Sequence, residues 1–321
     1  MRYVVRAATL PFDTEEEIFY DALFRQRRKH GVYCLVDAPL MEGAIADTHC
    51  HTHLLPDPAL AFARCAVNGV DFVCNMIDIV EDDPCTRENV RAWLQDAARV
   101  RDEIAPGCTR SLPQVCFAAG CHPHNAKDFD AAAEQRLRQA LEDPQVCAIG
   151  EIGLDFHYDL SPRDVQEEVF RKQLRLAHEL GLPVVLHIRE AHDVALRVLL
   201  EEGFPSAGTL LHCFNLGPED LAPWLEHDCY VGLGGPVTFK KSDFTREAAK
   251  NVPLNRLLTE TDAPYMTPEP MRGITCWADH VIFTADALAR ERGCATSQER
   301  ADFFRALHNN ALRFYGFAQE A

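Results

Sequence analysis

Residues 146–188 read VCAIGEIGLDFHYDLSPRDVQEEVFRKQLRLAHELGLPVVLHI, and this stretch decides the fold. It starts with an apolar run of strand length at 146–151 and ends with another at 183–188. Between them, residues 161–180 predict a helix, because a serine and a proline begin the segment, apolar residues recur near one face, and a glycine follows it. A strand, a helix and a second strand in this order are typical of a parallel sheet.

The same alternation recurs along most of the chain. Apolar runs of strand length occupy 44–47, 71–77, 114–120, 146–151, 183–188, 208–213, 229–234 and 256–261. Eight strands interleaved with helices predict an α/β fold, and specifically a TIM-like (β/α)8 barrel. Local periodicity does not show whether the sheet closes, so an open doubly wound sheet remains an alternative.

Residues 1–43 stand outside this alternation, and we interpret them as an N-terminal extension to a barrel that spans 44–321. Within the extension, 12–31 could form a helix with a basic end. A second irregular stretch, at about 81–113, is expected to cover part of the barrel.

Composition excludes several classes of protein. The chain has 321 residues, 47% hydrophobic and 25% charged, which is ordinary globular composition. It lacks both a run of roughly 20 apolar residues for a membrane helix and a secretory signal, so we expect a cytoplasmic protein that is not bound to membranes. The 13 cysteines are scattered without any CxxC motif, which favours free buried thiols over disulfides or a structural zinc site. A net charge of -17 opposes non-specific binding to polyanions, and nothing indicates an obligate protein partner.

Side chains of metal-ligand type gather at the carboxyl ends of the predicted strands, where barrel enzymes build their active sites. The first strand leads into His49 and His51, which point the same way because alternate residues of an extended segment share a face. The complete predicted set is His49, His51, Glu151, His187, His212 and Asp262. Glu151 can bridge two divalent cations, with His49, His51 and Asp262 on one and His187 and His212 on the other.

The motifs in this order resemble the TatD-type metal-dependent hydrolases, which belong to the amidohydrolase-like barrels. The resemblance covers roughly 45–316 and is carried by DTHCH (47–51), GCHPH (120–124), GEIGLDF (150–156), PVVLHIREA (183–191), LHCF (211–214), TETDAPY (259–265) and NALRFYG (310–316). It implies a divalent-metal phosphodiesterase, often described as a DNase, and carries metal binding onto the same six residues. It also implies that His122 and His124 contact the substrate phosphate, with Arg189 as a further contact.

Two positions depart from that family pattern. Thr52 and His53 stand where the family usually has a Leu-Asp pair, so His53 could alter the mouth of the site. The Arg272-Gly273 pair is kept, but the expected Asn-x-Pro does not follow it. Substrate preference is therefore less firmly predicted than metal binding.

The leading hypothesis is hydrolysis of a phosphodiester in DNA or a short oligonucleotide by a metal-activated water, of a deoxyribonuclease or exonuclease type. Asp262 is the preferred general base, and Glu151 is the second catalytic carboxylate. Four imidazoles favour zinc, manganese or nickel, while the resemblance suggests magnesium. One alternative is an amidohydrolase or esterase that acts on a small C–N or carboxylic-ester substrate. Another is a non-catalytic scaffold, which the complete ligand set disfavours.

Overall fold

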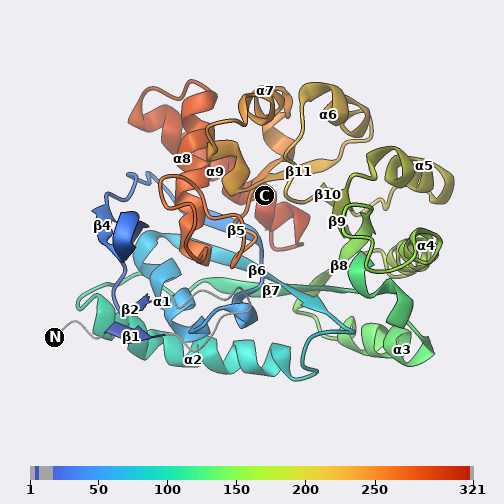
Figure 1. Cartoon of the computed structure of the whole chain (residues 1–321), viewed down its shortest axis with the longest axis horizontal. Helices are drawn as coiled ribbons and strands as arrows, with labels where there is room; N and C mark the ends of the chain where they lie inside the picture. The colour runs from blue at the N-terminus through green and yellow to red at the C-terminus, as the bar shows by residue number, and fades with distance from the viewer. Residues whose placement is uncertain (1–3, 7–16, 319–321) are drawn as a thin grey trace.

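Eight parallel strands form the centre of the molecule in the computed structural model, which describes residues 4–6 and 17–318 (Figure 1). The strands pair with their neighbours in chain order from β5 to β12. Their bounds are β5 Ile45–Cys50, β6 Val70–Asp78, β7 Gln114–Gly120, β8 Val146–Asp155, β9 Val184–Arg189, β10 Thr209–Leu211, β11 Tyr230–Leu233 and β12 Leu257–Thr259. All eight predicted strands are present, which confirms the TIM-like barrel.

The first and last strands of the sheet meet and nearly close the barrel. The Thr48 hydroxyl donates to the carbonyl of Thr259 over 2.9 Å, and the Thr259 hydroxyl donates to the carbonyl of Ala46 over 3.0 Å. Beyond the strand ends, the Asp262 backbone N–H donates to the carbonyl of His49 over 2.9 Å. These bonds between β5 and the segment around β12 exclude the open doubly wound sheet.

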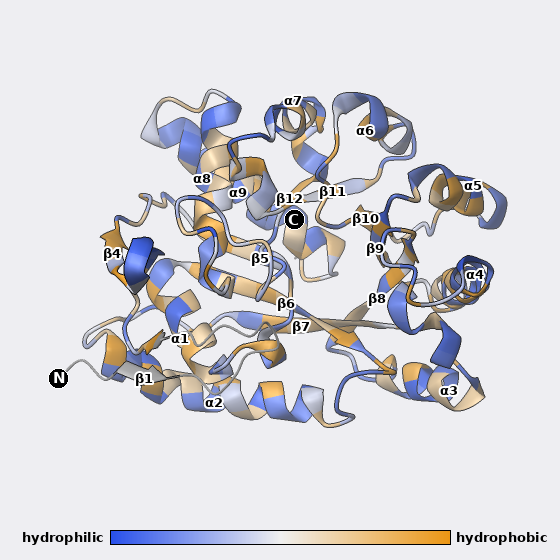
Figure 2. Ribbon diagram, in the orientation of Figure 1, coloured by the Kyte–Doolittle hydropathy of each residue, from blue (hydrophilic) through white to orange (hydrophobic). Residues whose placement is uncertain are grey.

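Helices follow the strands and surround the barrel (Figure 1). Their bounds are α1 Pro58–Asn68, α2 Thr86–Ile104, α3 Ala131–Ala140, α4 Arg163–Leu180, α5 His192–Glu202, α6 Pro218–Leu225, α7 Asp243–Asn251, α8 Val281–Glu291 and α9 Ser297–Phe314. In Figure 2 the central strands are mostly hydrophobic, whereas the surrounding helices carry both hydrophobic and hydrophilic residues. This is expected for helices that bury only one face. None of the described helices combines the length and the apolarity needed to cross a membrane.

The interior of the barrel is filled from the end where the strands begin. Phe72 and Tyr230 lie near the starts of β6 and β11, and they pack with Phe314 and Tyr315 at the end of α9. The Tyr315 hydroxyl also donates to the carbonyl of Thr48 over 2.7 Å. This apolar plug leaves the opposite, carboxyl end of the barrel for polar side chains.

The prediction of a helix at 12–31 is wrong for 17–31. Residues 12–16 lie outside the part of the chain that the structure describes. Strand β2 (Glu17–Phe19) pairs antiparallel with β1 (Val4–Arg6), and β3 (Phe24–Arg27) pairs antiparallel with β4 (Tyr33–Val36). The short 3-10 segment η1 (Lys29–Gly31) forms the turn of the second hairpin.

Local conformation and packing explain this difference. His30 and Gly31 have φ values of 63° and 71°, which an α-helix cannot contain and which tight hairpin turns require. Phe24 is buried, with its ring 4.9 Å from that of Phe283 on α8. The burial of one aromatic side chain against the barrel thus outweighs the helical pattern of the charges.

The stretch at 81–113 also differs from the expectation, because most of it forms the 19-residue helix α2. Four of its residues, Thr86, Val90, Ala97 and Val100, are buried. Because few positions in this segment are apolar, its helical periodicity could not be recognised in the sequence. All 13 cysteines are free in the described part of the chain, but only seven are buried, so the expectation of buried thiols holds for about half of them.

Candidate metal centre

A cavity of about 710 Å³ opens at the carboxyl ends of the strands. Five of the six predicted ligands line it, namely His51, Glu151, His187, His212 and Asp262. The predicted substrate contacts His122, His124 and Arg189 line it as well. His49 does not line the cavity, because it is fully buried beneath its floor.

Strand β5 brings His49 and His51 to the same side of the barrel, with their ring centroids 5.4 Å apart. Together with Asp262 they offer three ligand atoms that all lie within 4.8 Å of one another. Both ring nitrogens of the buried His49 lack a hydrogen-bond partner among the described residues. Burying ring nitrogens that make no hydrogen bond is costly, and a divalent cation between this ring and the nearby carboxylates would supply the missing partner, so the side chains present fit a metal ion.

Glu151 lies at the centre of four imidazoles. Its Oε1 is 3.4 Å from His49 Nε2, 3.5 Å from His187 Nδ1 and 2.9 Å from His212 Nε2. Its other oxygen, Oε2, is 3.4 Å from His51 Nε2. Burial alone would raise the pKa of this carboxyl, but the surrounding histidines hold the pKa well below its usual range. The carboxylate thus faces three imidazoles with Oε1 and the fourth with Oε2, and in its ionised form it could bind a divalent cation.

The strand that carries Glu151 is longer than predicted. The sequence indicated an end at 151, whereas β8 continues to Asp155. Its pairing with β9 is irregular between Ile149 and Ile152, which is where Glu151 lies. The carboxylate therefore projects from a distorted part of the strand rather than from its end.

Asp262 follows β12 and contacts the first pair of histidines. Its Oδ1 is 3.7 Å from His49 Nε2 and 3.6 Å from His51 Nε2. Burial raises the pKa of this carboxyl, but hydrogen bonding to His51 and the nearby imidazoles lower it further, so the net direction is downward. Its φ of 59° lies in the left-handed region, a strained conformation that is often kept at functional sites.

His187 and His212 lie side by side, with His212 Nε2 3.4 Å from His187 Nδ1. The ligand groups that the structure brings within 4.8 Å are nonetheless divided differently from the predicted sets. His212 groups with His49 and Glu151, and His187 groups with His122 and His124.

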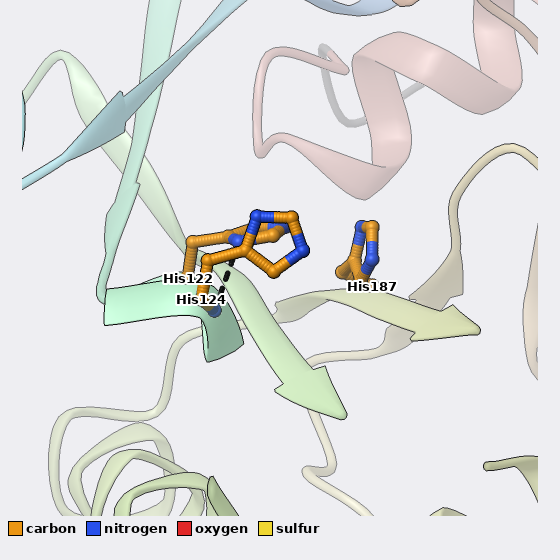
Figure 3. A group of neighbouring side chains, drawn as sticks. All are labelled: His122, His124 and His187. Carbon is orange, nitrogen blue, oxygen red and sulfur yellow. Dashed lines mark hydrogen bonds between the residues drawn. The ribbon is translucent and has the colours of Figure 1, made fainter. Parts of the chain in front are cut away.

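The group of His122, His124 and His187 has the spacing of a further cation site (Figure 3). The ring centroid of His122 is 4.3 Å from that of His124 and 4.3 Å from that of His187. His122 Nδ1 accepts the backbone N–H of His124 over 3.2 Å, so the hydrogen of a neutral His122 ring is on Nε2. With a donor on Nε2, His122 fits an anion better than a cation.

Arg189 ends β9, and its guanidinium lies 4.7 Å from the centroid of the Tyr158 ring. An ion pair with Glu190 or Glu151 would be the alternative to a substrate contact for Arg189. Glu190 contacts His157 Nδ1 instead, over 2.6 Å, and no carboxylate among the described residues forms an ion pair with Arg189. The charge of Arg189 is therefore available in the cavity.

Two carboxylates that the sequence analysis did not single out lie behind the histidines. Asp155 Oδ2 is 3.1 Å from His187 Nε2, and Glu260 Oε1 is 3.4 Å from His212 Nδ1. Carboxylates in this position orient metal-binding imidazoles and set which nitrogen carries the hydrogen. Asp155 ends β8, four residues after Glu151, and Glu260 directly follows β12, two residues before Asp262, and that spacing was the available signal.

His53, which departs from the family pattern, lies in η2 (Thr52–Leu54) and lines the cavity. Its Nε2 is 3.0 Å from Asp82 Oδ1, and its Nδ1 is 3.3 Å from the amide nitrogen of Asn75. His53 thus joins the segment after β5 to the segment after β6 at the mouth of the site. Arg272 lies outside the cavity lining, with its guanidinium 4.1 Å from the centroid of the Phe239 ring.

Comparison with known proteins places this site in a family. The model of the family TatD related DNase matches residues 46–316. The uncharacterized metal-dependent hydrolase YcfH of Escherichia coli (strain K12) is 35% identical over 280 residues, which cover 84% of this chain and 97% of that protein. A protein named 3'-5' ssDNA/RNA exonuclease TatD, from Enterobacter lignolyticus (strain SCF1), is 40% identical over 154 residues, which cover 48% of this chain and 59% of that protein.

Solved structures agree with the sequence relatives. The structure of YJJV, a TatD homologue from Escherichia coli K12, covers 86% of this chain and 99% of its own, with a TM-score of 0.70 and 26% identity. A hydrolase of the TatD family from Entamoeba histolytica covers 87% and 100%, with a TM-score of 0.72 and 16% identity, and so supports the fold alone. With a matching family model, a relative aligned over nearly its full length and the same barrel, this chain belongs to the TatD family of metal-dependent hydrolases.

Proposed function

We propose that this protein hydrolyses phosphodiester bonds in DNA or short oligonucleotides, with two divalent cations held at Glu151. His49, His51 and Asp262 would bind one cation, and His187 and His212 the other, with Glu151 between them. The observation that carries the proposal is the contact of one ionised, buried carboxylate with four imidazoles, at 2.9 to 3.5 Å. The donor set suits zinc, manganese or nickel, and magnesium is a further candidate.

The cations, when bound, would lower the pKa of a water molecule and neutralise charge on the phosphoryl oxygens. Asp262 lines the cavity and has a lowered pKa, so it is ionised at neutral pH and can accept the proton of the attacking water. Glu151, which is also ionised, would hold the two halves of the site together.

The phosphate would be held by donors in the same cavity beside His187, since the His122 ring lies 4.3 Å from that of His187 and Arg189 is on the same strand. His122 presents Nε2–H, and Arg189 presents an unpaired guanidinium beside Tyr158. The ring of His124 lies near the rings of His122 and His187. Charge-assisted hydrogen bonds of this kind position a phosphodiester and stabilise the charge that develops on it.

The nucleic-acid substrate is suggested by relatives that are named ssDNA/RNA exonucleases. We propose that the catalytic unit is the barrel at 44–321 and that 1–43 are an appended segment, since the family match begins at residue 46. The net charge of -17 implies that binding depends on contacts inside the cavity rather than on a basic surface.

One observation favours hydrolysis of an acyl substrate as the second candidate. The cavity lining includes the carboxylates of Asp78, Glu81, Asp82 and Asp83, and Arg189 is its one Lys or Arg side chain among the described residues. Such a lining opposes a polyanion, whereas a small amide or ester would not be repelled. The same activated water can attack a carbonyl carbon.

Purified, metal-loaded protein should be assayed on single-stranded oligonucleotides, on bis-p-nitrophenyl phosphate and on a panel of amides and esters. We expect phosphodiester cleavage that is lost in Asp262→Asn and kept in Asp193→Asn, which changes an exposed aspartate on α5. Acyl turnover without phosphodiester cleavage would establish the second candidate. Unchanged activity of Asp262→Asn would remove that residue from the mechanism.

A further inference from the structure

Asp155 ends β8 and is fully buried beside the cavity. Its Oδ1 accepts the backbone N–H groups of His157 and Tyr158, each over 2.9 Å. Gln166 on α4 holds the backbone of Asp155 on both sides, with its Oε1 2.8 Å from the Asp155 nitrogen and its Nε2 3.1 Å from the Asp155 carbonyl oxygen. The carboxylate is therefore fixed in place before any ligand binds.

The second carboxylate oxygen of Asp155 is shared by two histidines. Its Oδ2 is 2.9 Å from His124 Nε2 and 3.1 Å from His187 Nε2. An ionised carboxylate only accepts hydrogen bonds, so the Nε2 atoms of both rings carry hydrogen. The two rings come from different elements, His124 from the segment after β7 and His187 from β9, as Figure 3 shows.

The consequence for His187 is a defined tautomer. With hydrogen on Nε2, the neutral ring has its lone pair on Nδ1, the nitrogen that faces Glu151 at 3.5 Å and His212 at 3.4 Å. A metal-binding imidazole needs this free nitrogen on the side of the ion, with the other nitrogen donating to a carboxylate.

We propose that Asp155 is a positioning residue that serves two parts of the site at once. It turns His187 Nδ1 toward the cations, and it holds His124 beside the phosphate. This inference rests on the proposed function. It also argues against a third cation shared by His122, His124 and His187, because His122 Nδ1 accepts a backbone N–H and the hydrogen of the neutral ring is then on Nε2.

Asp155→Asn tests the proposal, because an amide nitrogen at the Oδ2 position would face two N–H donors. We expect the affinity for one of the two cations to fall by about 10- to 100-fold, measured by calorimetric titration of Mn²⁺ or Zn²⁺ into metal-free protein. We also expect the KM for bis-p-nitrophenyl phosphate to rise. His124→Gln separates the two roles, since it should raise KM and leave the affinity for both cations unchanged.

Asp279→Asn is the matched control. Asp279 is also fully buried and hydrogen-bonded, to Arg64 and Asn68 at 3.0 and 2.9 Å, but it lies outside the cavity lining. It should lower thermal stability without changing the affinity for cations. A drop in cation affinity in both variants would reduce the role of Asp155 to general stabilisation of the fold.

The outcomes separate this inference from the proposed function. Unchanged cation affinities in Asp155→Asn would overturn it, even if the enzyme cleaves phosphodiesters. A third equivalent of cation that His122→Ala removes would also overturn it. If Asp155→Asn does not fold, ¹⁵N NMR of histidine-labelled, metal-free wild type decides: hydrogen on His187 Nε2 supports the proposal, and hydrogen on Nδ1 contradicts it.

Discussion

His49 is the residue whose environment is hardest to explain without a metal ion. It is fully buried, its ring stacks on that of His212 with centroids 3.9 Å apart, and neither of its nitrogens has a hydrogen-bond partner among the described residues. Loss of hydration without a compensating contact costs about 1 to 3 kcal/mol for a neutral polar group. A bound ligand that contacts the ring nitrogens would offset this free-energy cost.

His49→Ala should therefore remove one cation and most of the activity. We expect metal analysis to find about one equivalent fewer than in wild type, and kcat/KM to fall by about 100-fold or more, because metal activation of water supplies several kcal/mol. His178→Ala is the matched histidine control, since His178 is on α4 and, among the described residues, its ring contacts the carbonyl of Gly203 alone by a hydrogen bond. Wild-type metal content in His49→Ala would contradict the assignment.

Arg189→Met tests the phosphate side of the cavity and keeps much of the packing on Tyr158. A hydrogen bond to a charged group is worth about 1.5 to 3 kcal/mol, so KM should rise by about 10- to 100-fold while the metal content stays constant. Arg305→Met removes an exposed arginine that pairs with Asp302 on α9, and steady-state kinetics should show no effect. Equal KM values for both variants would place Arg189 outside the substrate site.

The sequence could predict that the six proposed ligands lie close together, because each stands at or near the end of an apolar strand-length run. Asp155 and Glu260 were missed, although they lie only four residues after Glu151 and two before Asp262. Their role depends on contacts with His187 and His212, which other strands supply. Pairing across strands is not encoded in a local pattern.

At the scale of elements, the close approach of β8 and β9 positions Glu151 and His187. Gly153 pairs with His187 and has a φ of 142°. A Cβ atom added at Gly153 would lie only 2.1 Å from the His187 carbonyl oxygen. Position 153 therefore requires glycine because the two strands approach too closely for a Cβ atom.

Gly153→Ala should separate the two strands and weaken cation binding. Gly181→Ala, at the end of α4, is the matched control, since its φ is 65° but no atom would lie within 4 Å of the added Cβ. The control should cost about 1 to 2 kcal/mol for the left-handed conformation, and Gly153→Ala about 1 to 3 kcal/mol more for the steric overlap. Denaturation with urea measures both, and equal losses would refute the packing argument.

The strands were predictable because buried parallel strands are continuous apolar runs, and β7 matches its predicted range at both ends. The hairpin of β3 and β4 was not predictable in the same way. Its form depends on the burial of Phe24 against α8 and on two left-handed residues in the turn, neither of which the charge pattern reveals.

At the scale of the whole molecule, the metal centre joins parts of the chain that are far apart in sequence. The proposed ligands come from β5, β8 and β9 and from the segments after β5, β10 and β12, and the hydrogen bonds that close the barrel link residues more than 200 positions apart. Closure therefore brings His49 next to Asp262. Sequence could predict the alternation of elements, but not these distant contacts.

Because the cations would bind only the folded barrel, they should stabilise it as a whole. Each site at a free cation concentration 100-fold above its Kd contributes about 2.7 kcal/mol. Treatment with a chelator should lower the Tm by roughly 5 to 10 °C, and addition of the cation should restore it. A His49→Ala, His51→Ala double variant should show a much smaller shift in scanning calorimetry, and a full shift in that variant would locate the stabilising ions elsewhere.

Metal analysis of protein purified without chelator, combined with anomalous diffraction from its crystals, tests the central claim most directly. We expect two divalent cations, one on each side of Glu151, the first beside His49, His51 and Asp262 and the second beside His187 and His212. Finding no tightly bound or activating divalent cation, or finding the ions away from Glu151, would contradict it.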